Sequence, residues 1–112
     1  MEVQKDFKEF LALLNAHEVD FMIVGGYALA YHGAPRYTGD IDVFIKSDNK
    51  NAQRIITSIS GVSWEQADAS KEPGMYGDVP VFYIGKNQYV ANKKATGRTK
   101  DIADIEALGE ED

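Results

Sequence analysis

The 112-residue sequence contains no cysteine and no long apolar run. Without thiols, the chain cannot form disulfides, bind zinc through thiolates or use a cysteine nucleophile. Its longest apolar stretch, around residues 21–24, is far too short to cross a bilayer. The polar start, Met-Glu-Val-Gln-Lys-Asp, has neither the basic nor the apolar region of a signal peptide. We therefore expect a cytoplasmic protein that makes no membrane contact.

Positive charge is also scarce, because 12 basic residues stand against 18 acidic ones and the formal net charge is −6. Broad binding to DNA or RNA backbones needs clustered positive charge, so this balance argues against it. A small basic pocket for one nucleotide remains compatible with it. The apolar content of 44% is typical of globular proteins, and the length fits a single domain over residues 1–112.

Apolar periodicity predicts an α/β (α+β) fold, a small mixed β-sheet flanked by helices. The first helix is amphipathic and ends near His17. The expected strands are 20–24, 40–45 and 79–84, and the further helices are 27–32, 87–95 and 100–108. Pro80 places its strand at a sheet edge or at the strand's own start.

The middle of the chain is harder to interpret. Ser47 or Asp48 can cap a helix in which 52, 55, 56 and 59 share a face, but the β-branched run 55–59 also fits a strand. Ser63 begins a possible helical turn, and 71–77 is expected to be an exposed loop.

Gly25-Gly26 separates an expected strand from an expected helix. Backbone N–H groups at such a position, with no Cβ in the way, suit an anion. The alternative is a tight turn that needs glycine only for its geometry. Taken alone, the glycine pair favours the second interpretation.

Asp40 and Asp42 share one strand face, because side chains alternate along a strand. Two neighbouring carboxylates repel each other unless a cation lies between them. Magnesium prefers a few carboxylate oxygens together with substrate phosphates. Combined with the glycine turn, the two acids predict a magnesium and phosphate site, with both as metal ligands.

These residues resemble a known family. The segments 24–29 (Val-Gly-Gly-Tyr-Ala-Leu) and 36–43 (Arg-Tyr-Thr-Gly-Asp-Ile-Asp-Val) are similar to the nucleotidyltransferase fold of the DNA polymerase beta superfamily, especially to small prokaryotic members from abortive-infection and toxin–antitoxin systems. Two later motifs, 92–94 and 98–104, strengthen the likeness. It implies Mg²⁺-dependent transfer of a nucleoside monophosphate from an NTP to a hydroxyl of a protein or RNA, with Asp40 and Asp42 catalytic.

The candidate substrate-binding residues also include a late cluster. Asp101 lies on the apolar arc of the last helix and therefore needs a partner, for which nearby basic residues are available. Those residues, among them Lys93 and Lys100, form a positive patch suited to a triphosphate. Alternatively, Asp101 only complements the helix dipole.

Two residues of the loop before the acids complete the candidate set. Arg36 would reach a phosphate, and Thr38 would order the loop. A solvated loop arginine is the alternative.

The family's usual third carboxylate is missing from both later strand segments, and only Glu65 and Asp78 lie near enough in sequence to replace it. Three interpretations stay open. The chain works with two carboxylates, a neighbouring subunit of a homo-oligomer completes the site, or the domain is a degenerate binding module that acts through a cognate partner protein, as a toxin–antitoxin component would.

Overall fold

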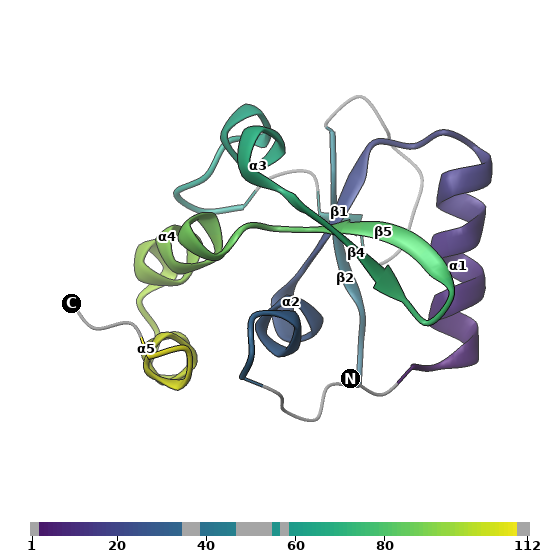
Figure 1. The fold of residues 1–112 in the computed structure, drawn as a ribbon. Coiled ribbons are helices and arrows are strands. Elements are labelled where there is room, and N and C mark those ends of the chain that lie inside the picture. The colour runs from purple at the N-terminus through teal and green to yellow at the C-terminus, as the bar shows by residue number, and fades with distance from the viewer. Residues whose placement is uncertain (1–2, 35–38, 47–54, 57–58, 110–112) are drawn as a thin grey trace.

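The computed structural model describes residues 3–34, 39–46, 55–56 and 59–109 (Figure 1). Within these ranges, one mixed sheet has the strand order β3-β2-β1-β5-β4. The strands are β1 (Phe21–Val24), β2 (Asp42–Ile45), β3 (Ile55–Ile56), β4 (Glu72–Tyr76) and β5 (Val79–Tyr83). The helices are α1 (Lys5–Ala16), α2 (Gly25–Tyr31), α3 (Trp64–Ser70), α4 (Lys86–Thr96) and α5 (Thr99–Ala107). The predicted fold class is confirmed.

The centre of the sheet is β1, which is buried along its whole length. It pairs antiparallel with β2, where Val24 lies opposite Asp42, and parallel with β5, where Ile23 lies opposite Tyr83. The end of β1, the start of β2 and the end of β5 therefore meet at one end of the sheet. No helix in the described part of the chain is long and apolar enough to cross a membrane.

The prediction of an exposed loop at 71–77 is wrong, because β4 occupies most of this segment and pairs antiparallel with β5. Gly77, at φ +62°, and Asp78 form the two-residue turn between the strands. A proline and a glycine inside β4 hid the strand from propensity arguments. Because β4 lies outside β5, the edge position proposed for the strand of Pro80 is also wrong, whereas its place near the strand's start is confirmed.

The helix proposed around Ile55 and Ile56 is wrong too, and the alternative strand is confirmed. These residues form β3, which pairs parallel with β2. Pairing with a neighbouring strand suits β-branched residues, and here it overrides the helical spacing. Residues 47–54, which include the proposed cap, lie outside the described part of the chain. The strand expected at 40–45 begins instead at Asp42, so Asp40 precedes it.

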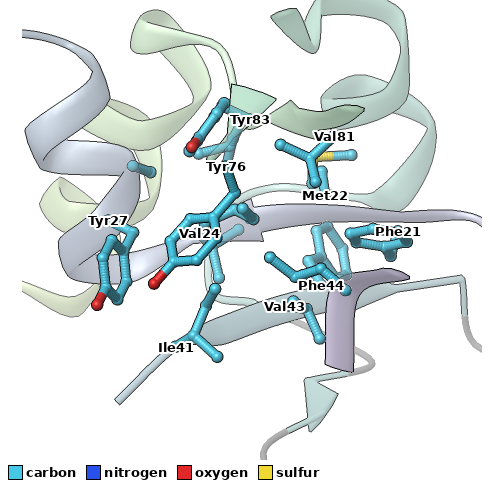
Figure 2. Close-up of a cluster of buried hydrophobic side chains, with 14 of the residues drawn as sticks. Phe21, Met22, Val24, Tyr27, Ile41, Val43, Phe44, Tyr76, Val81 and Tyr83 are labelled. Carbon is cyan, nitrogen blue, oxygen red and sulfur yellow. The ribbon is translucent and has the colours of Figure 1, made fainter. Parts of the chain in front are cut away.

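Aromatic contacts join the helices to both faces of the sheet. On one face, the ring of Tyr27 in α2 packs against that of Tyr76 in β4 (Figure 2), with 5.3 Å between the ring centroids. On the other face, Trp64 of α3 packs edge-on against Phe44 of β2, with 5.2 Å between the ring centroids. The core therefore lies on both sides of β1 and β2 and holds the end of β1 in place.

Candidate functional site

At the turn after β1, the Asp42 carboxylate packs against the backbone of a glycine, Gly25. Val24 ends β1 opposite Asp42, and Gly25 starts α2 with φ at +70°. A Cβ at Gly25 would lie 2.5 Å from Oδ2 of Asp42. Such a contact is impossible for a side chain, and the positive φ independently favours glycine. Gly25 is therefore required both for the turn and for the position of the Asp42 carboxylate.

The predicted alternation around the two acids is confirmed. Ile41 and Val43 are buried, at 1% and 0% exposure, whereas Asp40 is exposed and Asp42 is partly exposed. Both acids thus reach the surface at the end of the sheet where α2 begins. Gly26 lies in the first turn of α2, next to Gly25. The structure brings the glycine pair and Asp42 together, as the sequence predicted.

This donor set fits magnesium, which takes one or two carboxylates and completes its shell with water and phosphate oxygens. In the described ranges, no three or more histidine, aspartate or glutamate residues cluster so that they could hold a metal. Asp78 lies at the β4–β5 turn, at the opposite end of β5 from the site, and pairs with Lys8 at 3.2 Å. That position excludes Asp78 as the missing third acid.

The remaining predicted residues fall in different places. Arg36 and Thr38 lie outside the described residues, and Lys100 is exposed in the first turn of α5. Lys93 and Asp101 come together between α4 and α5. Lys93 Nζ lies 3.3 Å from Asp101 Oδ1 and 3.7 Å from Asp104 Oδ2.

Asp101 is completely buried and surrounded by donors. Its Oδ2 accepts hydrogen bonds from Thr96 Oγ1 at 2.6 Å, from Arg98 Nε at 2.8 Å and from the Arg98 backbone N–H at 3.2 Å. Its Oδ1 accepts from Arg98 Nη2 at 3.2 Å as well as from Lys93. The Arg98 guanidinium, with smaller contributions from Thr96 and Lys93, holds the pKa of Asp101 well below its usual range. The predicted need of this carboxylate for basic partners is confirmed.

Lys93 is itself largely enclosed, since its side chain is only 13% exposed. Besides the two aspartates it lies over the ring of Tyr89, at 5.5 Å from the centroid. These contacts tie α4 to α5. A contact between Lys93 and a phosphate stays a prediction.

Sequence reasoning missed Thr96, the donor nearest to Asp101. Thr96 ends α4, Gly97 follows at φ +64°, and α5 begins at Thr99. So short a connection forces the end of α4 against the first turn of α5. The Gly97 break was visible in the sequence and is the signal from which this contact could have been inferred.

Comparison with known proteins identifies a family for the chain. The model of a family described as nucleotidyl transferase AbiEii toxin, type IV TA system, matches residues 10–95. That range contains β1, α2, β2 and Lys93. No curated protein and no solved structure matches the chain. Since the match covers more than half of the sequence, the chain belongs to the AbiEii family of nucleotidyl transferase toxins from type IV toxin–antitoxin systems.

Proposed function

We propose that this chain transfers a nucleoside monophosphate from an NTP to a hydroxyl of a protein or RNA, with Mg²⁺ held by Asp40 and Asp42. The observation that carries the proposal is the Asp42 carboxylate packed against the bare backbone of Gly25 at the end of β1. It supports the proposal because a carboxylate, the type of group that binds Mg²⁺, lies beside a glycine turn and is partly exposed. Substrate phosphates and a hard cation need those two features side by side.

Each residue has a part in this reaction. Bound Mg²⁺ supplies positive charge to the phosphates. The N–H groups of Gly25 and Gly26 face the triphosphate, and Arg36 and Lys100 add positive charge to it. The acceptor oxygen bonds to the α-phosphorus while the bond from that phosphorus to the bridging oxygen breaks. Pyrophosphate leaves and the hydroxyl proton is released.

Asp42→Asn tests this proposal. The purified chain is incubated with labelled NTPs, Mg²⁺ and cell lysate, and label in protein and RNA is counted separately. We expect Asp42→Asn to lower transfer by about 100-fold or more, because the amide lacks the charge that holds the cation. Asp68→Asn, at an exposed acid of α3, is the matched control and keeps full transfer. Equal transfer by wild type and Asp42→Asn would refute the proposal.

A second candidate is a non-catalytic module that acts by binding a partner protein, such as the cognate antitoxin of its system. It is favoured by Lys93, whose charge is held by two buried carboxylates rather than offered to a pyrophosphate. This candidate predicts a stable complex with the partner and no Mg²⁺-dependent thermal shift with any NTP. A shift that requires both Mg²⁺ and one particular nucleotide would contradict it.

A further inference from the structure

One half of a sheet face carries apolar side chains that are open to solvent. The pairing registers place Phe82 on the same face as Met22 and Phe44, where α3 covers β2. Over the β4–β5 hairpin this face is exposed, with Met75 at 53% and Phe82 at 39%. We call the cross-strand set Pro73, Met75, Pro80 and Phe82 the hairpin face.

The hairpin face borders an open pocket of about 600 Å³. Asn15, in the last turn of α1, and Val19 and Asp20, which follow that helix, form the wall of the pocket outside the hairpin. The Asn15 side chain donates a hydrogen bond of 2.7 Å to the Pro80 carbonyl, which fixes this wall against the hairpin. A contiguous apolar surface with a shaped wall is typical of a protein-binding site.

The outer edge of β4 offers few free backbone groups to an added strand. In a hairpin with a two-residue turn, the residues that close the turn are hydrogen-bonded, so the backbone groups of Pro73 and Met75 point outward. Pro73 has no N–H, and its carbonyl accepts from the Tyr31 hydroxyl at 3.3 Å. The Met75 carbonyl accepts from the Tyr83 hydroxyl at 2.9 Å. The Met75 N–H is therefore the one outward donor of these two residues, and both of their carbonyls already accept a hydrogen bond.

Gly74 makes room for the two tyrosine rings whose hydroxyls bind these carbonyls. The rings of Tyr31 and Tyr83 stack at 4.2 Å, and a Cβ on Gly74 would lie 3.0 Å from both of them. Burial, followed by the neighbouring tyrosines, raises the pKa of Tyr83 to about 12, so its hydroxyl remains a donor at neutral pH. A partner therefore reaches this region through the side chains of the hairpin face and not by strand addition.

Opposite charges mark the two ends of this surface. Asp20 directly precedes β1, at the end of the hairpin face near Pro80. Lys71 directly precedes β4, at the other end. Its Nζ donates a hydrogen bond of 2.6 Å to Asp68 Oδ1 of its own chain and lies 4.2 Å from the centre of the Phe82 ring, so in the dimer it is shared between Asp68 and Asp20 of the other copy. A two-fold axis through the middle of the face would set Lys71 of each copy opposite Asp20 of the other. An isologous contact needs this kind of self-complementarity.

We propose that the hairpin face binds a second copy of this chain, face to face around a two-fold axis, with Phe82 and Met75 at its centre and the Asp20–Lys71 pairs at its rim. The surface has the anatomy of a small interface, an apolar centre with a charged rim. It is distinct from the Gly25–Asp42 site, so the dimer forms whether or not nucleotidyl transfer occurs.

Sedimentation velocity of the full chain over a wide range of concentration tests the apolar centre. We expect a monomer–dimer equilibrium whose dissociation constant rises by about tenfold or more in Phe82→Glu and Met75→Glu, because each variant buries a carboxylate in the contact. Leu13→Glu in α1 and Ile102→Glu in α5, exposed by 58% and 49%, are matched controls and leave the equilibrium unchanged. Circular dichroism verifies that each variant folds. A chain that stays monomeric throughout, or a dimer that survives Phe82→Glu, would overturn the proposal.

A charge exchange tests the two-fold arrangement. Asp20→Lys and Lys71→Glu each place like charges together twice in a homodimer, so each variant alone dimerises more weakly than wild type. Mixing the two in equal amounts restores dimerisation, because both rim pairs of the mixed dimer are then of opposite charge. Native mass spectrometry identifies that mixed dimer. If the mixture dimerises no more tightly than either variant alone, this two-fold arrangement is excluded.

Discussion

Two pairs of aspartates in this chain have similar spacing in sequence and opposite surroundings in the structure. Asp40 and Asp42 lie at the start of β2, one exposed and the other partly exposed, beside the bare backbone of Gly25. Asp101 and Asp104 are buried between α4 and α5, at 0% and 5% exposure. The first pair reaches the surface, and the second is enclosed with cations of its own chain.

This difference distinguishes acids that a ligand can reach from acids that stabilise the fold. A carboxylate that already accepts from Arg98, Thr96 and Lys93 gains little from a ligand and loses much if a donor is taken away. Carboxylates that reach the surface are accessible to a cation from solution, and Mg²⁺ takes carboxylate oxygens as ligands. The first pair is therefore suited to the chemistry of the family, and the second to holding the last helix.

The largest effect is expected from Asp101→Ala. It leaves Lys93 and part of Arg98 without their buried partner, and removing one member of a buried ion pair costs about 3–5 kcal/mol. Urea unfolding measures the change. Glu106→Ala, on the exposed face of the same helix, is the control and shifts stability by under about 0.5 kcal/mol. If Asp42→Asn lowered stability as much as Asp101→Ala, the contrast between the two pairs would fail.

Lys93→Met should have the next largest effect, a loss of about 2 kcal/mol, because two buried carboxylates lose one shared cation while the apolar stem is kept. Lys100→Met, at an exposed lysine of α5, is expected to be neutral for stability. Measuring NTP affinity on the same two variants sharpens the comparison. If Lys93 only holds α4 to α5, Lys93→Met lowers stability and leaves the NTP affinity unchanged. If Lys93→Met instead lowers the NTP affinity and leaves stability unchanged, Lys93 belongs to the nucleotide site.

A smaller loss, about 1–2 kcal/mol, is expected from Gly25→Ala, whose Cβ meets both a positive φ and the Asp42 carboxylate. Gly33→Ala is the matched control, because Gly33 has φ +104° but nothing within 4 Å of a Cβ. The excess loss at Gly25 over Gly33 isolates the contact with Asp42. In the double variant Gly25→Ala with Asp42→Ala, that excess should disappear in thermal unfolding. Equal losses of stability in Gly25→Ala and Gly33→Ala would show that the Asp42 carboxylate makes no close contact with the turn.

Much of the fold could be predicted because its signals are local. The buried run of β1 ends at the only adjacent glycine pair, and the burial of Ile41 and Val43 follows from simple alternation. The position of Asp42 beside the turn depends in addition on the pairing of β1 with β2. Burial of Asp101 was also predictable, since helical periodicity sets it on the apolar arc near Ile105.

What escaped prediction depends on tertiary contacts. Pro73 and Gly74 weaken the signal of β4, and the strand exists because β5 pairs with it and Tyr83 packs over Gly74. Ile55 and Ile56 fit a helix by spacing and a strand by shape, and only the neighbouring β2 decides between them. Likewise, the basic residues near Asp101 were visible, but the enclosure of Lys93 beside two buried aspartates requires α4 and α5 to be packed together.

The smallest expected effect is on the pH dependence of stability, and it tests whether Asp101 is held charged in the folded state. The folded-state pKa of Asp101 is depressed, so its stabilisation is fully present above the unfolded value of 3.8 and is lost as the pH falls towards the folded value. The stability difference between wild type and Asp101→Asn should therefore be constant from about pH 7 to 5. It should shrink by at most about 1 kcal/mol by about pH 3, because Arg98 is 67% exposed and solvent screens its pairing. Urea titrations at each pH measure the difference. A difference for Asp101→Asn that stayed constant into acid would mean that its carboxylate is not held charged by its donors.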